Sequence, residues 1–203
     1  MLKTAGHGGC NECRDLALLS LMFNTGARVS EIVALNTGDL RLSAPCSIAL
    51  RGKGRKERTC PIWPETAALL QKLIEHRDPA SGPSAPLFLN ARGARLTRFG
   101  IRLILTKYVA KAALRHRSLR NKRLHPHSIR HSTAVHLLRS GVDMSTIAHW
   151  LGHVSVNTTN KYLSIDLEAK REALAKAKPL LKGKPRSAKW HQDGKLIAWL
   201  TAL

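Results

Sequence analysis

The segment DLALLSLMFNTGARVSEIVAL, residues 15–35, determines how this chain begins to fold. Residues 15–23 are almost continuously apolar, which predicts a helix that is buried on most of its surface. Asn24-Thr25-Gly26 interrupts the apolar run and predicts the end of that helix. A second, shorter helix is predicted over 29–35, and Arg28 stands in the turn between the two. The sequence therefore predicts two consecutive helices joined by a turn that carries a guanidinium group.

Outward from this segment, most of the chain is predicted to be helical. Thr97 and Asp143 are well placed as N-caps, and Gly141 is well placed as a C-terminal stop. The predicted helices lie at 64–77, 97–114, 126–139, 143–152, from about 155 through Tyr162, and 167–176.

Two short strands are predicted at 47–50 and 58–62, joined by a glycine-containing hairpin tip over 51–57. Residues 87–90 fit either a short strand or a turn. The predicted fold class is therefore mainly α with a small antiparallel β-hairpin sheet.

The length of 203 residues suits one domain. We expect a flexible N-terminus over 1–14, a folded catalytic domain over 15–178, and a basic linker and C-terminal tail over 179–203. The apolar end of this tail, 196–203, is expected to dock on this subunit or on a neighbour. The chain has no apolar run long enough for a membrane span and no apolar core of a signal peptide at its start, so a cytoplasmic location is expected.

The charge balance points to a polyanionic partner. Lys and Arg number 34 against 13 Asp and Glu, which gives a net charge of +21. The basic residues recur along the whole chain instead of gathering in one amphipathic helix or terminal run, which favours a DNA duplex over a membrane surface. Aromatic residues are only 4% of the chain, which disfavours recognition by base stacking.

The cysteines and histidines do not predict a metal site. Cys10 and Cys13 have C-x-x-C spacing, with His7 three residues earlier, but Cys46 and Cys60 do not supply a matched second pair. Two histidine pairs stand four residues apart, His127/His131 and His149/His153. Neither pair encloses the acidic residue of the H-E-x-x-H metalloprotease pattern, so we expect no metal and no other cofactor.

Six polar residues from distant parts of the sequence form the candidate site: Arg28, Lys53, His127, Arg130, His153 and Tyr162. Two arginines and two histidines, brought together, would donate hydrogen bonds to the non-bridging oxygens of a phosphodiester. Negative charge grows on those oxygens as phosphorus becomes pentacoordinate, and preorganised cations stabilise that state more than the ground state. This set of residues therefore suits phosphoryl transfer without metal or nucleotide.

Tyr162 would supply the nucleophile of this reaction. Nearby cations lower the pKa of a phenol and favour the phenolate. Attack would leave the phosphate bonded to the tyrosine, which conserves the bond for religation. Lys53, on a hairpin tip that can enter a groove, is a credible proton donor to the leaving 5′-oxygen.

These residues stand in motifs that resemble those of the tyrosine recombinase family, the phage integrases and Xer-like recombinases. The motifs are Thr25-Gly26-Ala27-Arg28-Val29-Ser30-Glu31, Gly52-Lys53-Gly54, His127-Ser128-Ile129-Arg130, Leu151-Gly152-His153, and Tyr162 nine residues after His153. Each motif alone is weak evidence, but all six catalytic positions are filled with the usual residue types, in order. The resemblance covers roughly residues 15–175.

The resemblance implies the catalytic-domain fold of that family and a site-specific recombinase that cuts one strand at a time through a 3′-phosphotyrosyl link. In that scheme Arg28 and Arg130 hold the scissile phosphate, with Glu31 orienting Arg28. His127 and His153 bond the phosphate and assist proton movement, and Lys53 is the general acid. Four protomers on two duplexes would exchange strands, alone or with related recombinases, so the expected partners are double-stranded DNA and further copies at the nucleoid.

The chain departs from the family pattern at its N-terminus. Family members carry a helical core-binding domain before the catalytic domain, and here only about fourteen residues precede the first catalytic helix. We therefore expect that domain to be absent. Two alternative functions remain: a remnant that binds recombination sites without cutting, and a type IB topoisomerase-like activity. The favoured interpretation is DNA integration or recombination for a mobile element.

Overall fold

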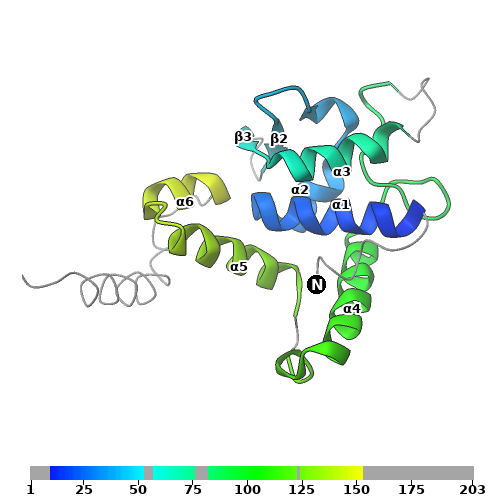
Figure 1. Ribbon diagram of the computed structural model, residues 1–203. Coiled ribbons are helices and arrows are strands. Elements are labelled where there is room, and N and C mark those ends of the chain that lie inside the picture. The colour runs from blue at the N-terminus through cyan, green and yellow to red at the C-terminus, as the bar shows by residue number, and fades with distance from the viewer. Residues whose placement is uncertain (1–9, 53–56, 76–81, 123, 153–203) are drawn as a thin grey trace, which may run out of the picture. The chain divides into compact units, whose positions relative to one another are not determined.

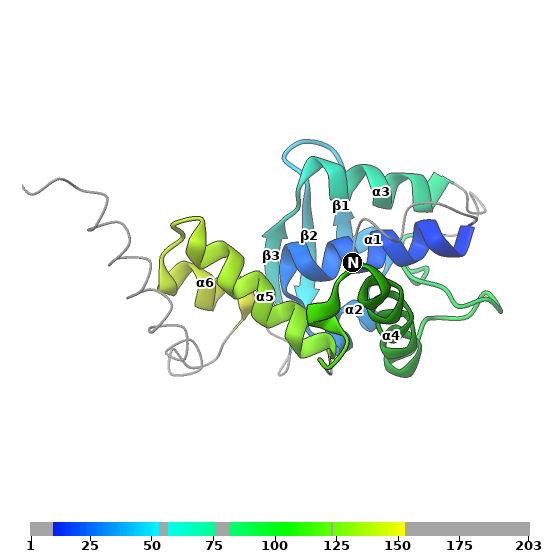
Figure 2. The ribbon, with the colours of Figure 1, turned by 60° about the horizontal axis from the view of Figure 1, so that its bottom comes forward.

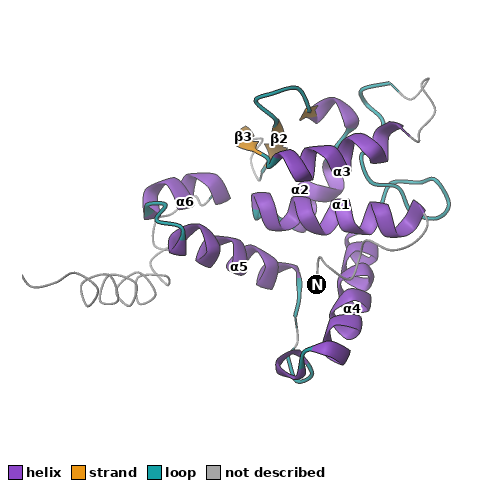
Figure 3. Cartoon of the chain, in the orientation of Figure 1, coloured by secondary structure: helices purple, strands orange, loops and turns teal. Residues whose placement is uncertain are grey.

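The computed structural model describes residues 10–52, 57–75, 82–122 and 124–152, all within a compact unit that spans residues 1–166 (Figure 1). Its elements in chain order are α1 (Cys10–Thr25), α2 (Val29–Ala34), the 3-10 helix η2 (Thr37–Asp39), β1 (Leu40–Arg41), β2 (Ser47–Arg51), β3 (Glu57–Pro61), α3 (Pro64–Glu75), α4 (Arg98–Arg115), the 3-10 helix η4 (Arg117–Leu119), α5 (Pro126–Arg139) and α6 (Met144–Leu151). Helices predominate and the strands form one small sheet (Figure 3), so the predicted fold class is confirmed.

Helix α1 lies at the centre of the core. Leu18, Leu19 and Leu21 are fully buried, and Met22 is 1% exposed. Helix α3 packs along α1, with the sheet and α4 nearby (Figure 2). Because α1 is surrounded by other elements, its apolar residues cover most of its circumference instead of one stripe.

Helix α1 begins at Cys10, five residues before the expected start at Asp15, so the expected flexible segment 1–14 is wrong for its last five residues. Polar contacts hold this first part of the helix. The Arg14 guanidinium donates to the Leu89 carbonyl at 3.0 Å, and Lys111 on α4 pairs with Glu12 at 3.4 Å. An apolar pattern could not predict a helix start that is held by polar side chains.

The sheet has three antiparallel strands in the order β1-β2-β3. The predicted hairpin is confirmed as β2 and β3, in which Ile48 pairs with Cys60 and both side chains are buried. Strand β1 was not predicted, because its two residues, Leu40 and Arg41, are too few to show alternation. The segment 87–90 is neither a named strand nor a turn: Leu89 forms an isolated antiparallel bridge with Arg95, and the turn between them begins at residue 91.

The predicted helix ends are confirmed. Thr97 accepts a hydrogen bond from the Gly100 amide at 3.1 Å and caps α4, and Asp143 accepts from the Thr146 amide at 2.9 Å and caps α6. Gly141, with a φ of 84°, follows α5 in the left-handed conformation that favours glycine. The helix that carries His127 and Arg130 therefore ends where the sequence predicts.

Helices α5 and α6 share a second apolar cluster around Leu138, Ile147 and Leu151. This cluster meets the end of α1 at Gly26, where an added Cβ would lie 2.5 Å from Leu151 Cδ2. The hydroxyl of Thr133 on α5 also donates to the Phe23 carbonyl at 2.6 Å. The end of α1 is thus held against both α5 and α6. No helix among the described residues is long and apolar enough to cross a membrane.

Candidate active site

A hollow of about 570 Å³ opens where the turn after α1, helix α4 and the start of α5 meet. Its lining residues are Ala27, Arg28, Val29, Ser30, Arg98, Arg102, His125, Pro126, His127 and Arg130. Four of these are arginines and two are histidines, and no carboxylate is among them. Such a lining attracts an anion that can accept several hydrogen bonds.

Arg130 is the buried arginine of the hollow. The residue is 6% exposed, and it lies one turn into α5. Its two terminal nitrogens donate to the carbonyls of Gly26 and Leu151, each at 2.6 Å. These two bonds fix the plane of the guanidinium and connect the end of α1 to the end of α6.

Arg28 is the N-cap residue of α2 and lines the same hollow. One terminal nitrogen donates to Glu31 at 3.2 Å and the other to the Gly152 carbonyl at 3.1 Å. The backbone amide of Arg28 also donates to Glu31 at 2.7 Å, so this carboxylate holds both the main chain and the side chain of Arg28. Because Arg28 and Arg130 donate to the carbonyls of adjacent residues, Gly152 and Leu151, their guanidiniums converge on one place.

Glu31 is itself buried, at 3% exposure, and is neutralised from a second direction by Arg58 on β3. The two Arg58 terminal nitrogens donate to the two carboxylate oxygens at 2.8 and 2.9 Å. Burial by itself raises the pKa of Glu31, but the hydrogen bonds and charges of Arg58 and Arg28 outweigh it, so that the pKa is lowered. Glu31 therefore stays ionised and acts as a fixed anchor for Arg28.

Gly152 closes α6 in the left-handed conformation, with a φ of 64°. A Cβ at this position would lie 2.9 Å from a terminal nitrogen of Arg58, so the close packing of the guanidinium also requires glycine. The residue that follows it in the sequence is His153. The Leu-Gly-His motif thus requires glycine at its second position, because the Arg58 guanidinium packs against Gly152.

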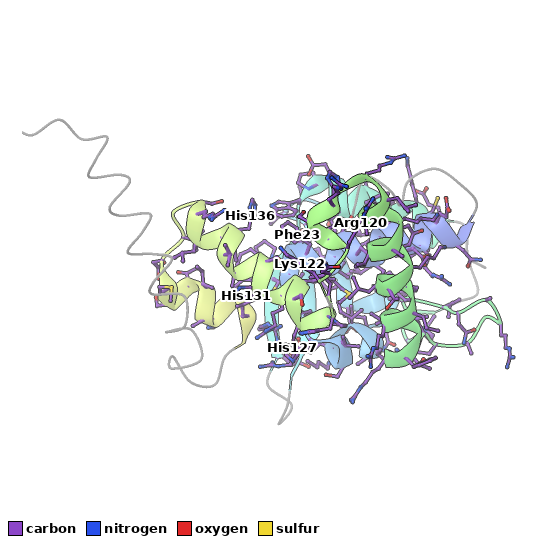
Figure 4. The ribbon with its side chains drawn as sticks, turned by 90° about the horizontal axis from the view of Figure 1, so that it is seen from below. Phe23, Arg120, Lys122, His127, His131 and His136 are labelled. Atoms are coloured by element: carbon purple, nitrogen blue, oxygen red, sulfur yellow. The ribbon has the colours of Figure 1, made fainter. Side chains whose placement is uncertain are left out.

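His127 lies in the first turn of α5, where the helix dipole favours an anion. Its ring lies 6.3 Å from that of His125, edge to face. Figure 4 shows His127, His131 and His136 following one another along α5, with Phe23 beside His136. The ring centroids of Phe23 and His136 are 5.5 Å apart. Only His127 and His125 of these line the hollow.

Two residues of the hollow, Arg98 and Arg102 on α4, were not separated from the other basic residues by sequence reasoning. Both are exposed and stand four residues apart, so they share a face of the helix. That spacing was the signal that could have found them. Arg58 was also missed, although alternation along β3 puts it on the same face as the buried Cys60.

Of the six predicted site residues, the structure brings Arg28, His127 and Arg130 together around one hollow. The expected contact between Glu31 and Arg28 is also present. Lys53, His153 and Tyr162 lie outside the described residues. The three described residues come from the turn after α1 and from α5, about a hundred positions apart in the sequence.

The described residues contain no group of three or more His, Cys, Asp or Glu side chains that could hold a metal ion. Cys10 and Cys13 lie in the first turn of α1, and His7 lies outside the described residues. His127 and His131 are one turn apart on α5. Of the second histidine pair, His149 is on α6 and His153 lies outside the described residues.

The chain belongs to the phage integrase family, whose family model matches residues 1–168. Its fold is that of a tyrosine recombinase catalytic domain.

Among similar proteins, one of Sinorhizobium fredii that carries the name integrase/recombinase y4rC is 40% identical over 190 residues, 94% of this chain and 56% of that protein. The tyrosine recombinase XerC of Syntrophus aciditrophicus is 35% identical over 178 residues, 84% of this chain and 55% of that protein. The crystal structure of XerA recombinase superimposes with a TM-score of 0.70 and 27% identity, covering 89% of this chain and 61% of that one. The chain thus spans little more than half the length of these two sequence relatives.

Proposed function

We propose that this chain is the catalytic part of a site-specific DNA recombinase that binds double-stranded DNA at the arginine-rich hollow and cleaves one strand through Tyr162. The observation that carries the proposal is the convergence of Arg28 and Arg130 on adjacent carbonyls at the edge of a hollow without carboxylates. A phosphodiester supplies oxygens that accept hydrogen bonds from such donors, and the negative charge on these oxygens increases during cleavage.

In this reaction the described residues bind the phosphate and stabilise the negative charge that develops on it. Arg28 and Arg130 bind the non-bridging oxygens of the scissile phosphate, and both are held in place before DNA arrives. His127, at the start of α5, donates a further hydrogen bond. Arg98 and Arg102 bind phosphates next to the reacting one, because they are exposed on the α4 side of the hollow.

The remaining steps fall to Tyr162, Lys53 and His153. The Tyr162 phenol loses its proton to water, and its oxygen attacks phosphorus and forms a 3′-phosphotyrosyl bond while the bond to the 5′-oxygen breaks. Lys53 gives the leaving oxygen its proton, and His153 supports the phosphate together with His127. Religation reverses these steps when the 5′-hydroxyl of the same or another strand attacks.

The experiment is to trap the covalent adduct. The full chain is incubated with a pool of nicked duplexes of randomised sequence, in which the cut fragment diffuses away, and denaturing gels then reveal protein bonded to DNA. The expected result is an adduct that is lost in Tyr162→Phe. Binding of DNA without any adduct would contradict cleavage and favour the binding-only alternative.

Tyr108, the only other tyrosine, supplies the matched control. It is fully buried, and burial, together with the carboxylates of Asp15 and Glu12, raises its pKa to about 12. A buried phenol that resists ionisation cannot attack DNA, so Tyr108→Phe should form as much adduct as the wild type. Loss of the adduct in both variants would show that the tyrosines act on folding instead of chemistry.

The proposal extends to the setting of the reaction. In this proposal the chain acts on a mobile element, at the nucleoid, as four protomers on two DNA sites. The solved complex of XerH with a palindromic difH substrate, 25% identical to this chain, supports DNA as the partner. The assembly is tested by sedimentation of the chain with a duplex that forms the adduct in the nicked-duplex pool. A complex of four protomers and two duplexes is expected, and one protomer per duplex would contradict the proposed assembly.

A further inference from the structure

We propose that Arg58, on β3, is a positioning residue for DNA cleavage, which acts by holding the carboxylate that orients Arg28 and the Trp150 carbonyl in the last turn of α6. This inference rests on the proposed function, and it assigns a role to an arginine outside the six candidate residues. Arg58 does not line the hollow, so it acts through other residues and not on DNA.

The first argument is the place of Arg58 in the sheet. Its side chain is only 9% exposed, on the same face of β3 as the buried Cys60. An arginine is costly to bury unless its donors find acceptors. Here three of its nitrogens donate, two to the Glu31 carboxylate and Nε to the Trp150 carbonyl at 3.0 Å. All three side-chain nitrogens thus form hydrogen bonds, which connect β3 to α2 and α6.

The second argument is what these acceptors hold in turn. Glu31 accepts from the main chain and the side chain of Arg28, so the position of the carboxylate sets that of the catalytic guanidinium. Trp150 stands two residues before Gly152, whose carbonyl accepts from Arg28. Arg58 therefore holds one acceptor of Arg28, Glu31, directly, and holds the segment that leads to the other, Gly152, through the Trp150 carbonyl.

The third argument is the connection along the chain. Arg58 stands five residues after Lys53, in the strand that leaves the hairpin tip. The same guanidinium contacts the last turn of α6, directly before His153 in the sequence. One side chain thus links the strand next to the proposed general acid with the helix next to the second histidine.

The test is the variant Arg58→Lys, which keeps a positive charge but cannot bind both carboxylate oxygens in parallel. With the full chain and the nicked-duplex pool, the single-turnover rate of adduct formation should fall about 10- to 100-fold, because a small displacement of a reacting group costs that much. DNA affinity should stay within about twofold, since Arg58 does not face the hollow.

The matched control is Arg95→Lys. Arg95 is, like Arg58, a partly buried arginine, and it donates to the carbonyls of Val33 and Leu35 and to the Asn36 side chain, none of which lines the hollow. Its replacement should lower the free energy of unfolding and leave the cleavage rate unchanged. An equal loss of rate in both lysine variants would overturn the proposal, because it would reduce Arg58 to a general structural role.

The double variant Glu31→Gln/Arg58→Gln separates positioning from stability. It removes both buried charges and leaves two amides that can bond each other, so stability should largely recover relative to Arg58→Gln alone. The cleavage rate should remain low, because Arg28 has lost its carboxylate. Recovery of the rate together with stability would overturn the proposal.

A measurement without DNA distinguishes the failure of this inference from failure of the proposed function. Nitrogen NMR of the arginine side chains reports rotation of the Arg28 guanidinium, assigned with Arg28→Lys. Slow rotation is expected in the wild type and fast rotation in Arg58→Lys. If the wild type forms no adduct, the proposed function fails and this spectrum alone decides the inference; slow rotation in both proteins would overturn it.

Discussion

The two sides of the hollow are built differently. On one side Arg28 and Arg130 donate to backbone carbonyls, with Arg130 only 6% exposed. On the other side Arg98 and Arg102 extend from α4 and are exposed.

This difference separates two tasks that positive charge performs at a phosphate. Donors that are fixed before the substrate arrives need no reorganisation as charge develops, so they lower the barrier of the reaction. Exposed arginines gain affinity by releasing counterions, and this gain depends on salt. The held side of the hollow should therefore govern the cleavage rate, and the exposed side should govern DNA affinity.

Arg130→Ala should give the largest effect. Loss of one preorganised donor costs about 10²- to 10³-fold in rate, and the rate should fall far more than the affinity for DNA. The Gly26 and Leu151 carbonyls also lose their donor, which costs about 1–3 kcal/mol of stability. Single-turnover adduct formation measures the rate, and urea unfolding measures the stability. An Arg130→Ala variant that binds DNA tenfold more weakly but cleaves it at the normal rate would contradict the division of roles between the two sides of the hollow.

Gly26→Ala should be next in size, because it disturbs the held side without removing a charge. Gly26 has a φ of 58° and its added Cβ would meet Leu151. Gly141→Ala is the matched control, since its φ of 84° is also positive but its surroundings are open. The left-handed conformation costs each variant about 1–3 kcal/mol. Gly26→Ala should lose more stability and also lose rate; equal unfolding midpoints in the two variants would show that the Leu151 contact carries no energy.

The double variant Arg98→Ala/Arg102→Ala should weaken DNA binding about tenfold and reduce the slope of log K against log salt by about 1.8, for two phosphate contacts. Its cleavage rate at saturating DNA should equal that of the wild type. Fluorescence anisotropy at several salt concentrations measures the slope. An unchanged slope would remove α4 from the DNA interface.

The smallest effect concerns Glu31 and pH. Because the folded state lowers the pKa of this carboxyl from its ordinary value of 4.5, its ionisation stabilises the fold above that value. This stabilisation is lost as the pH falls through the lowered pKa. The difference in unfolding free energy between the wild type and Glu31→Gln should therefore shrink below pH 4.5; a difference that grows on acidification would mean that the pKa is raised.

The sequence predicted those parts of the fold that have a local cause. The apolar run of α1, the N-caps Thr97 and Asp143, and the hairpin strands each depend on neighbouring residues, and all were found. The start of α1 at Cys10 depends on partners far along the chain, which no local pattern encodes, so this helix was predicted too short. Strand β1 was missed because its two residues are too few to show alternation.

The candidate site divides in the same way. Motif spacing indicated Arg28, His127 and Arg130, and the structure places them around one hollow. Arg58 has no motif of its own, because its importance comes from the acceptors Glu31 and Trp150 that folding brings to it. Residues that bond substrate can be recognised by type and spacing, whereas residues that position them become visible only in the folded chain.

The most direct test of the account is to identify the residue that becomes bonded to DNA. The trapped adduct is digested with protease and nuclease, and the modified peptide is sequenced by mass spectrometry. The account predicts a nucleotide 3′-phosphate esterified to Tyr162 and a free 5′-hydroxyl on the other fragment. A link at any other residue, or cleaved DNA with no link to the protein, would contradict it.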